Sequence, residues 1–387
     1  MKTIVVFSHL RWNFVFQRPQ HLLTRLSKDY RIVFVEEPMR TEGGPYMYST
    51  VAAPNIHVLV PHTNEEGWGF NDKQLVVMGK MTRDWLTNFD GITEGYGIWF
   101  YTPQALPMKD VLSPEFIVFD VMDELSLFKG APESLKVRET ELLKIADVVI
   151  AGGPSLYAAK KLIREDIICL PSSVDKEHYS PNRAEEVEAI GHEDDKLEHD
   201  IPHPRLGFVG VIDERLDIDL ITAIAAEDPH WHVVMVGPVV KIDPATLPQA
   251  HNIHWLGQQD YAILPQIVHT WDVCLLPFAL NDSTKFISPT KTLEYMAAEK
   301  PIVSTDIHDV VELYGDVVLI GKSHAQFIDA IKLILSEEPA AREDRIKRGL
   351  EIVSRSSWDT TAEKVHQAIE DALNRKDMGR INLGGTD

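Results

Sequence analysis

A segment in the C-terminal half of the sequence carries residue types suited to binding a nucleotide. Residues 286–306 read FISPTKTLEYMAAEKPIVSTD, a predicted helix followed directly by an apolar strand, and three residues stand at the helix start: Ser288, Pro289 and Thr290. Backbone N–H groups at a helix start lack partners within the helix and, together with the helix dipole, attract anions. Lys291 could neutralise a diphosphate there, and Glu294 could accept hydrogen bonds from both hydroxyls of a ribose.

The same residues have a purely structural alternative. Thr290 could cap the helix while Lys291 and Glu294 are solvated on its surface, as in many isolated helices. The proline before the helix and the short link to a buried strand favour the binding interpretation. The preceding loop holds four polar residues that could contact phosphates or a sugar, or could be solvated: Asn281, Ser283, Thr284 and Lys285.

Two turns in the same half are further candidates. Leu256, Gly257 and Gln258 follow a strand end, where main-chain groups could contact a uracil-like base, although a simple turn explains them equally well. Asp217 and Asp219 form an Asp-x-Asp pair, which can hold a metal ion between carboxylates and a diphosphate. Because they stand at a predicted helix start, capping is favoured over metal binding, and no metal site is predicted.

Polar residues also follow strands in the N-terminal half. Asp120 and Asp123 come at and after the end of the run FIVFD, where a carboxylate could orient an acceptor hydroxyl or take its proton. Capping of the next helix is the alternative for Asp123. After the first strand, FSHLRWNFVFQRPQH contains four further candidates: His9, Arg11, Trp12 and Arg18. This turn lacks the Gly-x-Gly-x-x-Gly pattern, which argues against an NAD-binding enzyme.

The elements that must position these candidates alternate between strand and helix. β-branched or aromatic runs each precede an amphipathic stretch in both halves, which predicts two parallel α/β domains. We expect a Rossmann-like acceptor domain (1–180), an acidic linker or excursion (181–204), a Rossmann-like donor domain (205–355), a last helix (356–375) and a flexible tail (376–387). Ligands bind beyond the carboxyl ends of parallel strands, so two such domains facing each other would form one cleft.

The composition excludes other classes of protein. With 44% hydrophobic and 25% charged residues, the 387-residue chain is globular, and a formal charge of −21 argues against nucleic-acid binding. Cys169 and Cys274 lie in apolar runs as core residues, which favours a reduced, cytoplasmic protein. No secretion signal or transmembrane span is predicted. Lys160, Lys161 and Arg164 lie close together on one predicted helix and suggest weak membrane contact or a solvated helix face.

Several of these segments resemble one enzyme family. Residues 288–304 resemble the donor-binding helix of GT-B glycosyltransferases, in particular the family-4-like group (glycosyl transferases group 1), whose pattern runs Ser-Pro-x-Lys-x-x-Glu-Tyr-Met/Leu-Ala-x-x-Lys-Pro-Val-Val-Ser. Residues 206–220 resemble the glycine turn that opens the second domain, and residues 255–278 resemble its nucleotide-base region. Residues 171–181 resemble the interdomain segment, and residues 11–21 match a subgroup pattern, Arg-Trp-x-Phe-Val-x-Gln-Arg-Pro-Gln-His.

The resemblance implies a glycosyltransferase that moves a hexose-type sugar from a nucleotide-diphosphate donor, with a UDP-sugar favoured. Its acceptor would be a glycan, a lipid-linked sugar or a small molecule, with retention at the anomeric carbon and no cofactor or metal. The basic residue after the turn at Gly210, which is Arg215, would hold the diphosphate together with Lys291. The last helix, near Trp358, would cross back to the first domain. Three residues would face the cleft: His9, Arg11 and Arg18.

One position departs from the family pattern. Phe286 stands where many relatives carry a second glutamate, eight positions before Glu294, that contacts the donor sugar. This departure keeps a non-catalytic nucleotide-sugar-binding partner subunit as an alternative. The second alternative is a GT-B-type epimerase or phosphorylase, which would use the same cleft for a different second substrate.

Overall fold

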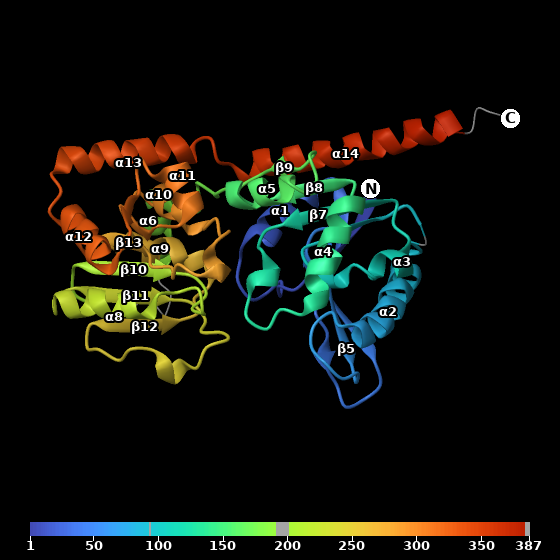
Figure 1. Ribbon diagram of the computed structural model, residues 1–387, viewed down its shortest axis with the longest axis horizontal. Coiled ribbons are helices and arrows are strands. Elements are labelled where there is room, and N and C mark those ends of the chain that lie inside the picture. The colour runs from blue at the N-terminus through green and yellow to red at the C-terminus, as the bar shows by residue number, and fades with distance from the viewer. Residues whose placement is uncertain (93, 191–200, 384–387) are drawn as a thin grey trace. The chain divides into compact units, whose positions relative to one another are not determined.

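The computed structural model describes residues 1–92, 94–190 and 201–383, and the chain divides into two compact units (Figure 1). Unit 1 comprises Met1–Pro171 together with Trp358–Asp387, and unit 2 comprises Ser172–Ser357. The chain therefore leaves unit 1 once and returns to it for its last helix.

Unit 1 is built on a sheet of nine strands, counted over the described residues. Across the sheet these are β3 (Met39–Arg40), β5 (Ile56–Thr63), β2 (Tyr30–Glu36), β1 (Lys2–Ser8), β6 (Gly97–Phe100), β7 (Phe116–Val121), β8 (Val148–Ala151) and β9 (Ile168–Cys169), with β4 (Tyr46–Ala53) paired to β5. The β4–β5 pair is antiparallel, and the other neighbouring pairs are parallel. Strand β1 is central, and its side chains from Ile4 to Phe7 are fully buried, as parallel sheets require.

Helices pack around this sheet. They are α1 (Arg18–Leu26), α2 (Asp72–Asp90), α3 (Met108–Leu112), α4 (Glu133–Ile145), α5 (Pro154–Lys161) and α14 (Trp358–Leu383), with the 3-10 turns η1 (Pro103–Ala105) and η2 (Leu125–Leu127). Helix α1 starts with a capping box, in which the Gln17 N–H donates to the Gln20 side chain at 3.1 Å. Helix α14 packs along α1, where Trp358 stacks on His21 with ring centroids 4.8 Å apart (Figure 1).

The C-terminal helix belongs to unit 1, as the resemblance implied, and it is longer than predicted. It runs to Leu383, so residues 376–383 of the predicted flexible tail are helical, and residues 384–387 lie outside the described part of the chain. Lys376 explains the extension, because its Nζ donates to the Asp147 carboxylate at 2.7 Å and to the Glu115 carbonyl oxygen at 2.8 Å. These contacts hold the end of α14 on unit 1, where the polar composition had predicted a flexible tail.

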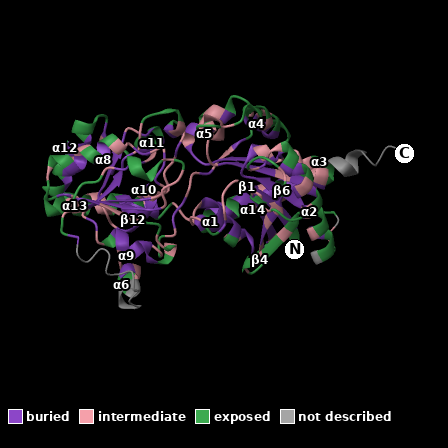
Figure 2. Ribbon diagram, turned by 90° about the horizontal axis from the view of Figure 1, so that it is seen from below, coloured by how far each residue is buried: buried purple, intermediate pink, exposed green. Residues whose placement is uncertain are grey.

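Unit 2 is built on a six-stranded parallel sheet, again counted over the described residues. Its order is β12 (Ile253–Gly257), β11 (His232–Val236), β10 (Arg205–Val209), β13 (Val273–Leu276), β14 (Ile302–Thr305) and β15 (Leu319–Gly321). Its helices are α6 (Pro181–Ile190), α8 (Ile218–Glu227), α9 (Leu264–His269), α10 (Lys291–Ala297), α11 (His308–Tyr314), α12 (His324–Leu335) and α13 (Pro339–Val353), with η4 (Pro244–Thr246), η5 (Tyr261–Ile263) and η6 (Asp282–Thr284). In each unit the strands are mainly buried, while many helices keep exposed faces (Figure 2).

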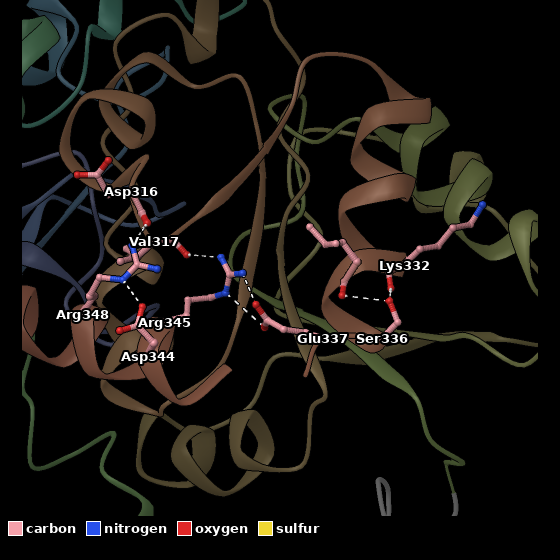
Figure 3. Close-up of polar contacts among 9 residues, drawn as sticks. Asp316, Val317, Lys332, Ser336, Glu337, Asp344, Arg345 and Arg348 are labelled. Carbon is pink, nitrogen blue, oxygen red and sulfur yellow. Dashed lines mark hydrogen bonds and ion pairs between the residues drawn. The ribbon is translucent and has the colours of Figure 1, made fainter. Parts of the chain in front are cut away.

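Polar contacts fix the long helix α13 within unit 2 (Figure 3). Arg345 donates to the Glu337 carboxylate, between α12 and α13, and to the Val317 carbonyl oxygen at 3.5 Å. Arg348 donates to the Asp316 carbonyl oxygen at 2.6 Å. Because α13 packs against α10, these contacts support the helix that carries the candidate donor residues.

The predicted linker at 181–204 needs a correction. Its first ten residues form α6, which packs on α9 and so belongs to unit 2. Residues 191–200 lie outside the described residues. The acidic residues of this segment led us to predict a linker and to overlook the start of a helix. At that start Ser180 Oγ accepts from the Arg183 N–H at 3.3 Å, and Pro181 occupies the first helical position.

The predicted basic patch on α5 is also corrected. Lys160 is buried and donates to the Glu139 carboxylate at 2.8 Å, while Arg164 binds Asp166 at 2.6 Å, so two of the three cations are engaged within unit 1. Lys161 is exposed. Over the ranges given above, none of the helices has the length and apolar content needed to cross a membrane.

Candidate functional site

Three glycines form the carboxyl edge of the unit 2 sheet around β10. Gly210 donates its N–H to the Val236 carbonyl oxygen at 2.9 Å, and Gly237 donates to the Gly257 carbonyl oxygen at 2.7 Å. Gly237 has φ 141°, and a Cβ there would lie 1.8 Å from the Gly210 carbonyl oxygen. The Gly237 and Gly210 backbones therefore approach too closely for a side chain at Gly237.

The turn after β10 holds Arg215 in a fixed position. Its Nε and Nη2 donate to the two carboxylate oxygens of Asp213 at 2.9 and 2.8 Å. The Asp213 side chain is 4% exposed, whereas that of Arg215 is 24% exposed. The Arg215 carbonyl oxygen accepts from the Ala279 N–H at 2.8 Å, which joins this turn to the segment after β13. Arg215 is thus a partly exposed cation oriented by a buried carboxylate.

Helix α10 carries the second predicted cation. Lys291 Nζ binds Glu294 Oε2 at 2.7 Å, with the two side chains 15% and 6% exposed. Thr290 makes no side-chain cap, and the Val209 N–H donates to the Tyr295 hydroxyl oxygen at 2.9 Å, which ties α10 to the end of β10. The alternative of a capped helix with solvated Lys291 and Glu294 is therefore wrong.

The start of α10 offers fewer N–H groups than predicted. The Thr292 N–H donates to the Pro289 carbonyl oxygen at 3.2 Å, and the Leu293 and Glu294 N–H groups donate to Thr290 at 3.1 and 3.3 Å. The first turn thus uses these donors itself. The anion-binding capacity of this segment rests mainly on the Lys291 side chain.

The loop before α10 is ordered by its own polar residues. Asn281 Oδ1 accepts from the Ser283 N–H at 3.0 Å, and Thr284 Oγ1 donates to the Ala279 carbonyl oxygen at 2.5 Å. Lys285 Nζ lies 5.3 Å from the centroid of the Phe286 ring. Asn281 and Thr284 therefore maintain the loop, and Lys285 is exposed on it.

Asp217 has a structural role. It is the N-cap of α8, with its Oδ1 accepting from the Leu220 N–H at 2.8 Å, and its Oδ2 lies 2.8 Å from His324 Nε2. This is the capping that the sequence favoured over metal binding. No group of three or more His, Cys, Asp or Glu side chains is arranged to hold a metal within the part of the chain that the structure describes.

An aromatic group near Glu294 was missed by the sequence analysis. His178 stacks on Tyr261 with ring centroids 4.0 Å apart, and its Nε2 lies 3.0 Å from the Tyr261 carbonyl oxygen. Burial lowers the pKa of His178. Tyr179, the next residue, is 1% exposed, and burial together with the Glu294 charge raises its pKa well above the usual value. The segment 171–181 had signalled only a domain boundary, because nothing in it pointed to α10.

In unit 1 the structure brings Arg18 and Asp120 together. Arg18 Nε lies 3.1 and 3.0 Å from the two Asp120 oxygens, and its Nη1 donates to the Leu170 carbonyl oxygen at 2.9 Å. The side chains are 2% and 0% exposed. Burial raises the pKa of Asp120, and Arg18 opposes this change. The predicted direct contacts of Arg18 and Asp120 with an acceptor are therefore corrected, because neither side chain reaches the surface and the two form a buried ion pair.

The residues after β1 separate into exposed and buried groups. Arg11 is 37% exposed at its side chain and donates to Glu36 Oε2 and to the Glu37 carbonyl oxygen, both at 2.8 Å. Trp12 is 9% exposed and packs edge-on against Phe34, so its prediction as an acceptor contact is corrected to a core role. Partly exposed His9 and Arg11 therefore remain the surface candidates at this edge.

Asp123 lies after β7 and is partly exposed. The N-cap of the following turn η2 is Glu124, without a side-chain cap hydrogen bond, and that of α4 is Pro132. The capping alternative for Asp123 is therefore wrong, and its carboxylate is a surface candidate beside buried Asp120.

Comparison with known proteins agrees with this geometry. Residues 203–337 match the family model described as glycosyl transferases group 1. TuaH of Bacillus subtilis (strain 168), named as a teichuronic acid biosynthesis glycosyltransferase, is 23% identical over 261 residues, which cover 62% of this chain and 64% of TuaH. The match thus spans less than two thirds of that relative.

Solved structures show the fold. Sucrose-phosphate synthase from Thermosynechococcus elongatus has a TM-score of 0.74 at 15% identity, over 97% of this chain and 100% of that one. HepE from Anabaena, in complex with UDP-glucose, has a TM-score of 0.71 at 15% identity, over 96% and 100%. The predicted class, two Rossmann-like α/β units with a C-terminal helix returned to the first, is confirmed.

Proposed function

We propose that this GT-B glycosyltransferase, whose residues 203–337 carry the group 1 family domain, transfers a hexose from a UDP-sugar to a carbohydrate acceptor. The observation that carries the proposal is the pairing of partly exposed Lys291 with buried Glu294 on α10, beside the glycine edge of the unit 2 sheet. HepE, a structural neighbour, was solved with UDP-glucose and with UDP and glucose.

In this proposal the donor diphosphate is bound by Lys291 and Arg215. Each cation is oriented by a buried carboxylate, Glu294 or Asp213, and keeps an exposed side for a ligand. Negative charge develops on the diphosphate as the glycosidic bond breaks, and cations already fixed in place stabilise it without reorganisation. Glu294 accepts the ribose hydroxyls, and Lys285 contributes further positive charge.

The main-chain edge binds the rest of the donor. Gly210 and Gly257 offer their backbone groups to the donor, and Leu256 and Gly257 contact the base. Ser288, Pro289 and Thr290 shape the entry to α10. Phe286 offers an aromatic ring where a carboxylate is common among relatives, so the donor sugar meets fewer acceptor groups at this position.

The acceptor belongs to unit 1 in this proposal. His9 and Arg11 bind it, Asp123 takes the proton of its reacting hydroxyl, and Arg18 with Asp120 fixes the loops that carry these residues. Transfer proceeds with retention at the anomeric carbon and without a metal. TuaH is named for teichuronic acid biosynthesis, which makes a growing polysaccharide the first acceptor to try.

Phe286 also favours a second candidate function, a partner subunit that binds a nucleotide sugar without transferring it. The two functions differ in turnover. Donor binding without release of UDP, in the presence of a panel of acceptor glycans, would establish the second.

Thermal stability against a panel of UDP, GDP, ADP and CDP tests the donor site. A ligand at 100 times its Kd stabilises the native state by about 2.7 kcal/mol, which is a readily measured rise in Tm. We expect UDP to raise Tm more than the other nucleotides do. If all four leave Tm unchanged at millimolar concentration, the chain has no such site.

A further inference from the structure

One tryptophan of unit 1 lies almost entirely in solvent. Trp68 is 93% exposed, whereas each of the other seven tryptophans of the chain is buried or half-buried. A large aromatic side chain can bury about 150–250 Å² of surface, so an exposed indole forgoes a large contribution to the core. Because single apolar residues on a surface are common, the role of Trp68 must be argued from its surroundings.

The loop that carries Trp68, between β5 and α2, is held by the residues that follow it. Asn71, the N-cap of α2, donates from Nδ2 to the Trp68 carbonyl oxygen at 3.2 Å and accepts from the Lys73 N–H at 3.1 Å. Phe70 is 2% exposed and packs edge-on against Phe7 of β1, with ring centroids 6.2 Å apart. The backbone that carries the exposed indole is therefore anchored to the central strand of the sheet.

The same loop passes beside a residue that binds Arg11. Gly67 and Gly69, on either side of Trp68, have φ 104° and 60°, in the left-handed region that favours glycine. A Cβ at Gly69 would lie 2.7 Å from Glu37 Oε1, and the Glu37 carbonyl oxygen accepts from Arg11 Nη1 at 2.8 Å. Trp68 therefore lies at the carboxyl edge of the unit 1 sheet, one residue from a contact with the partner of Arg11.

The charges near Trp68 favour a carbohydrate over an anionic lipid surface. Glu65 and Glu66 precede it on the loop, Glu37 lies beside the loop, and Lys73 Nζ is 3.9 Å from Glu66 Oε2. A surface rich in carboxylates is repelled by anionic lipid headgroups, whereas carboxylates accept hydrogen bonds from sugar hydroxyls. The indole also has few rotatable bonds, so covering it with a ligand costs little conformational entropy.

We propose that Trp68 is a binding residue for the acceptor, and that a sugar ring stacks on its indole next to Arg11. This inference deepens the proposed function and rests on it. The C–H groups on one face of a pyranose ring are apolar, and the negative face of the indole attracts them. Hydroxyls at the edge of the same ring can donate to the Glu37 carboxylate. Trp68 thus contributes to acceptor affinity and leaves donor binding to unit 2.

The experiment compares Trp68→Ala and Trp68→Phe with the wild type. An array of bacterial oligosaccharides and polysaccharides identifies the glycan that the wild type binds most tightly, and calorimetry then measures its Kd. We expect Trp68→Ala to raise this Kd about tenfold, which corresponds to about 1.4 kcal/mol. Trp68→Phe keeps a flat ring and should retain most of the affinity. Both variants should keep the wild-type Tm and Kd for UDP, because the side chain is exposed and the donor residues lie in unit 2.

Tyr48→Ala is the matched control. Tyr48 is an aromatic residue of β4 in the same unit and is 53% exposed. Its replacement should leave the Kd for the glycan unchanged. An equal loss in Tyr48→Ala and Trp68→Ala would show a general effect of removing surface aromatic groups and would overturn the assignment of the subsite to Trp68.

Quenching of tryptophan fluorescence by acrylamide shows whether the ring is covered. Because the other tryptophans are buried or half-buried, the most strongly quenched part of the emission belongs to Trp68. The glycan should protect this part in the wild type, and Trp68→Phe should lack it. Equal quenching with and without the glycan would show that the indole stays uncovered and would overturn the inference.

The remaining outcomes separate this inference from the proposed function. If the wild type binds no UDP, the proposed function fails, and the assignment of an acceptor to Trp68 fails with it. If the wild type binds UDP but no glycan of the array, or if Trp68→Ala binds the glycan equally well, this inference alone fails. If Trp68→Ala loses only sedimentation with vesicles of phosphatidylglycerol and phosphatidylethanolamine, the indole contacts lipid and the inference is overturned.

Discussion

The two units each pair a cation with a carboxylate near the carboxyl ends of their strands, but the pairs differ in exposure. In unit 1, Arg18 and Asp120 are 2% and 0% exposed. In unit 2, the Lys291 and Glu294 side chains are 15% and 6% exposed, and those of Arg215 and Asp213 are 24% and 4% exposed. A cation enclosed by protein can only hold its partner. A partly exposed cation can also contact a ligand. The exposure of the cation therefore distinguishes a structural ion pair from one that can bind a ligand.

The largest expected effect comes from breaking the enclosed pair. Asp120→Ala leaves Arg18 buried without a counter-charge, and such a loss destabilises a protein by about 3–5 kcal/mol. We expect urea unfolding to report a fall of that size in the free energy of unfolding. Below the unfolding transition the Kd for UDP should match that of the wild type, because the donor residues lie in unit 2. A loss under about 1 kcal/mol would contradict the assignment of this pair as structural.

Breaking the Lys291–Glu294 pair of unit 2 should lower the rate of the reaction. Lys291→Ala removes a cation from the leaving diphosphate, and losing one such transition-state contact lowers the rate by about 10²–10³-fold, or about 2.7–4 kcal/mol. The measurement is kcat/KM for release of UDP from the donor. Lys322→Ala, at an exposed lysine of unit 2, is the control and should retain activity. If kcat/KM of Lys291→Ala stays within twofold of the wild-type value, the Lys291–Glu294 pair is structural, like the Arg18–Asp120 pair of unit 1.

A smaller effect is expected at Asp217, a carboxylate of unit 2 that serves only as a cap. Asp217→Ala should destabilise the protein by about 1 kcal/mol, the usual loss for an N-cap. Its activity should equal that of the wild type both with added Mg²⁺ and with a chelator. Loss of activity that Mg²⁺ modulates would instead make the Asp-x-Asp pair part of the donor site.

The last effect concerns the pH dependence of stability, and its sign differs between the units. Burial raises the pKa values of Asp120 and Glu139 in unit 1, so the folded state binds protons first on acidification and its stability increases. In unit 2, burial lowers the pKa values of His178 and His254. Below about pH 6.5 the unfolded state then binds protons first, and stability falls by at most about 1.4 kcal/mol per pH unit for each proton.

Thermal melting between about pH 7.5 and pH 5.5 measures this contribution. His178→Gln should show a smaller loss of Tm on acidification than the wild type, because one titrating group is gone. If the variant loses as much Tm on acidification as the wild type does, His178 does not contribute to the acid sensitivity of the protein.

The sequence predicted the parts of the fold whose signal is local. Central strands such as β1, β10 and β13 are continuous apolar runs, the kind of pattern on which the predicted alternation of strands and helices rests. Strands β4 and β5 and helix α2 were missed. Most of β4 is an exposed edge strand, and β5 contains Pro61, so neither has the apolar run that predicts a buried strand.

Contacts between side chains far apart in the chain could not be predicted from the sequence. Arg18 and Asp120 were both identified as site residues, but their 102-residue separation hides the contact that buries them. Lys291 and Glu294 lie three residues apart on one helix, so their proximity followed from helical geometry. Tyr179 was overlooked because its nearness to Glu294 depends on the fold and not on its place in the sequence.

Hydrogen–deuterium exchange with and without UDP tests the central claim most directly, because it shows where the nucleotide binds. The account predicts slower exchange in peptides covering residues 208–216, 255–259 and 285–297 of unit 2, and no protection of residues 8–18 in unit 1 beyond that of a nucleotide-free control. Protection at 8–18 with none at 285–297 would place the nucleotide in unit 1 and contradict the assignment of the donor site to α10.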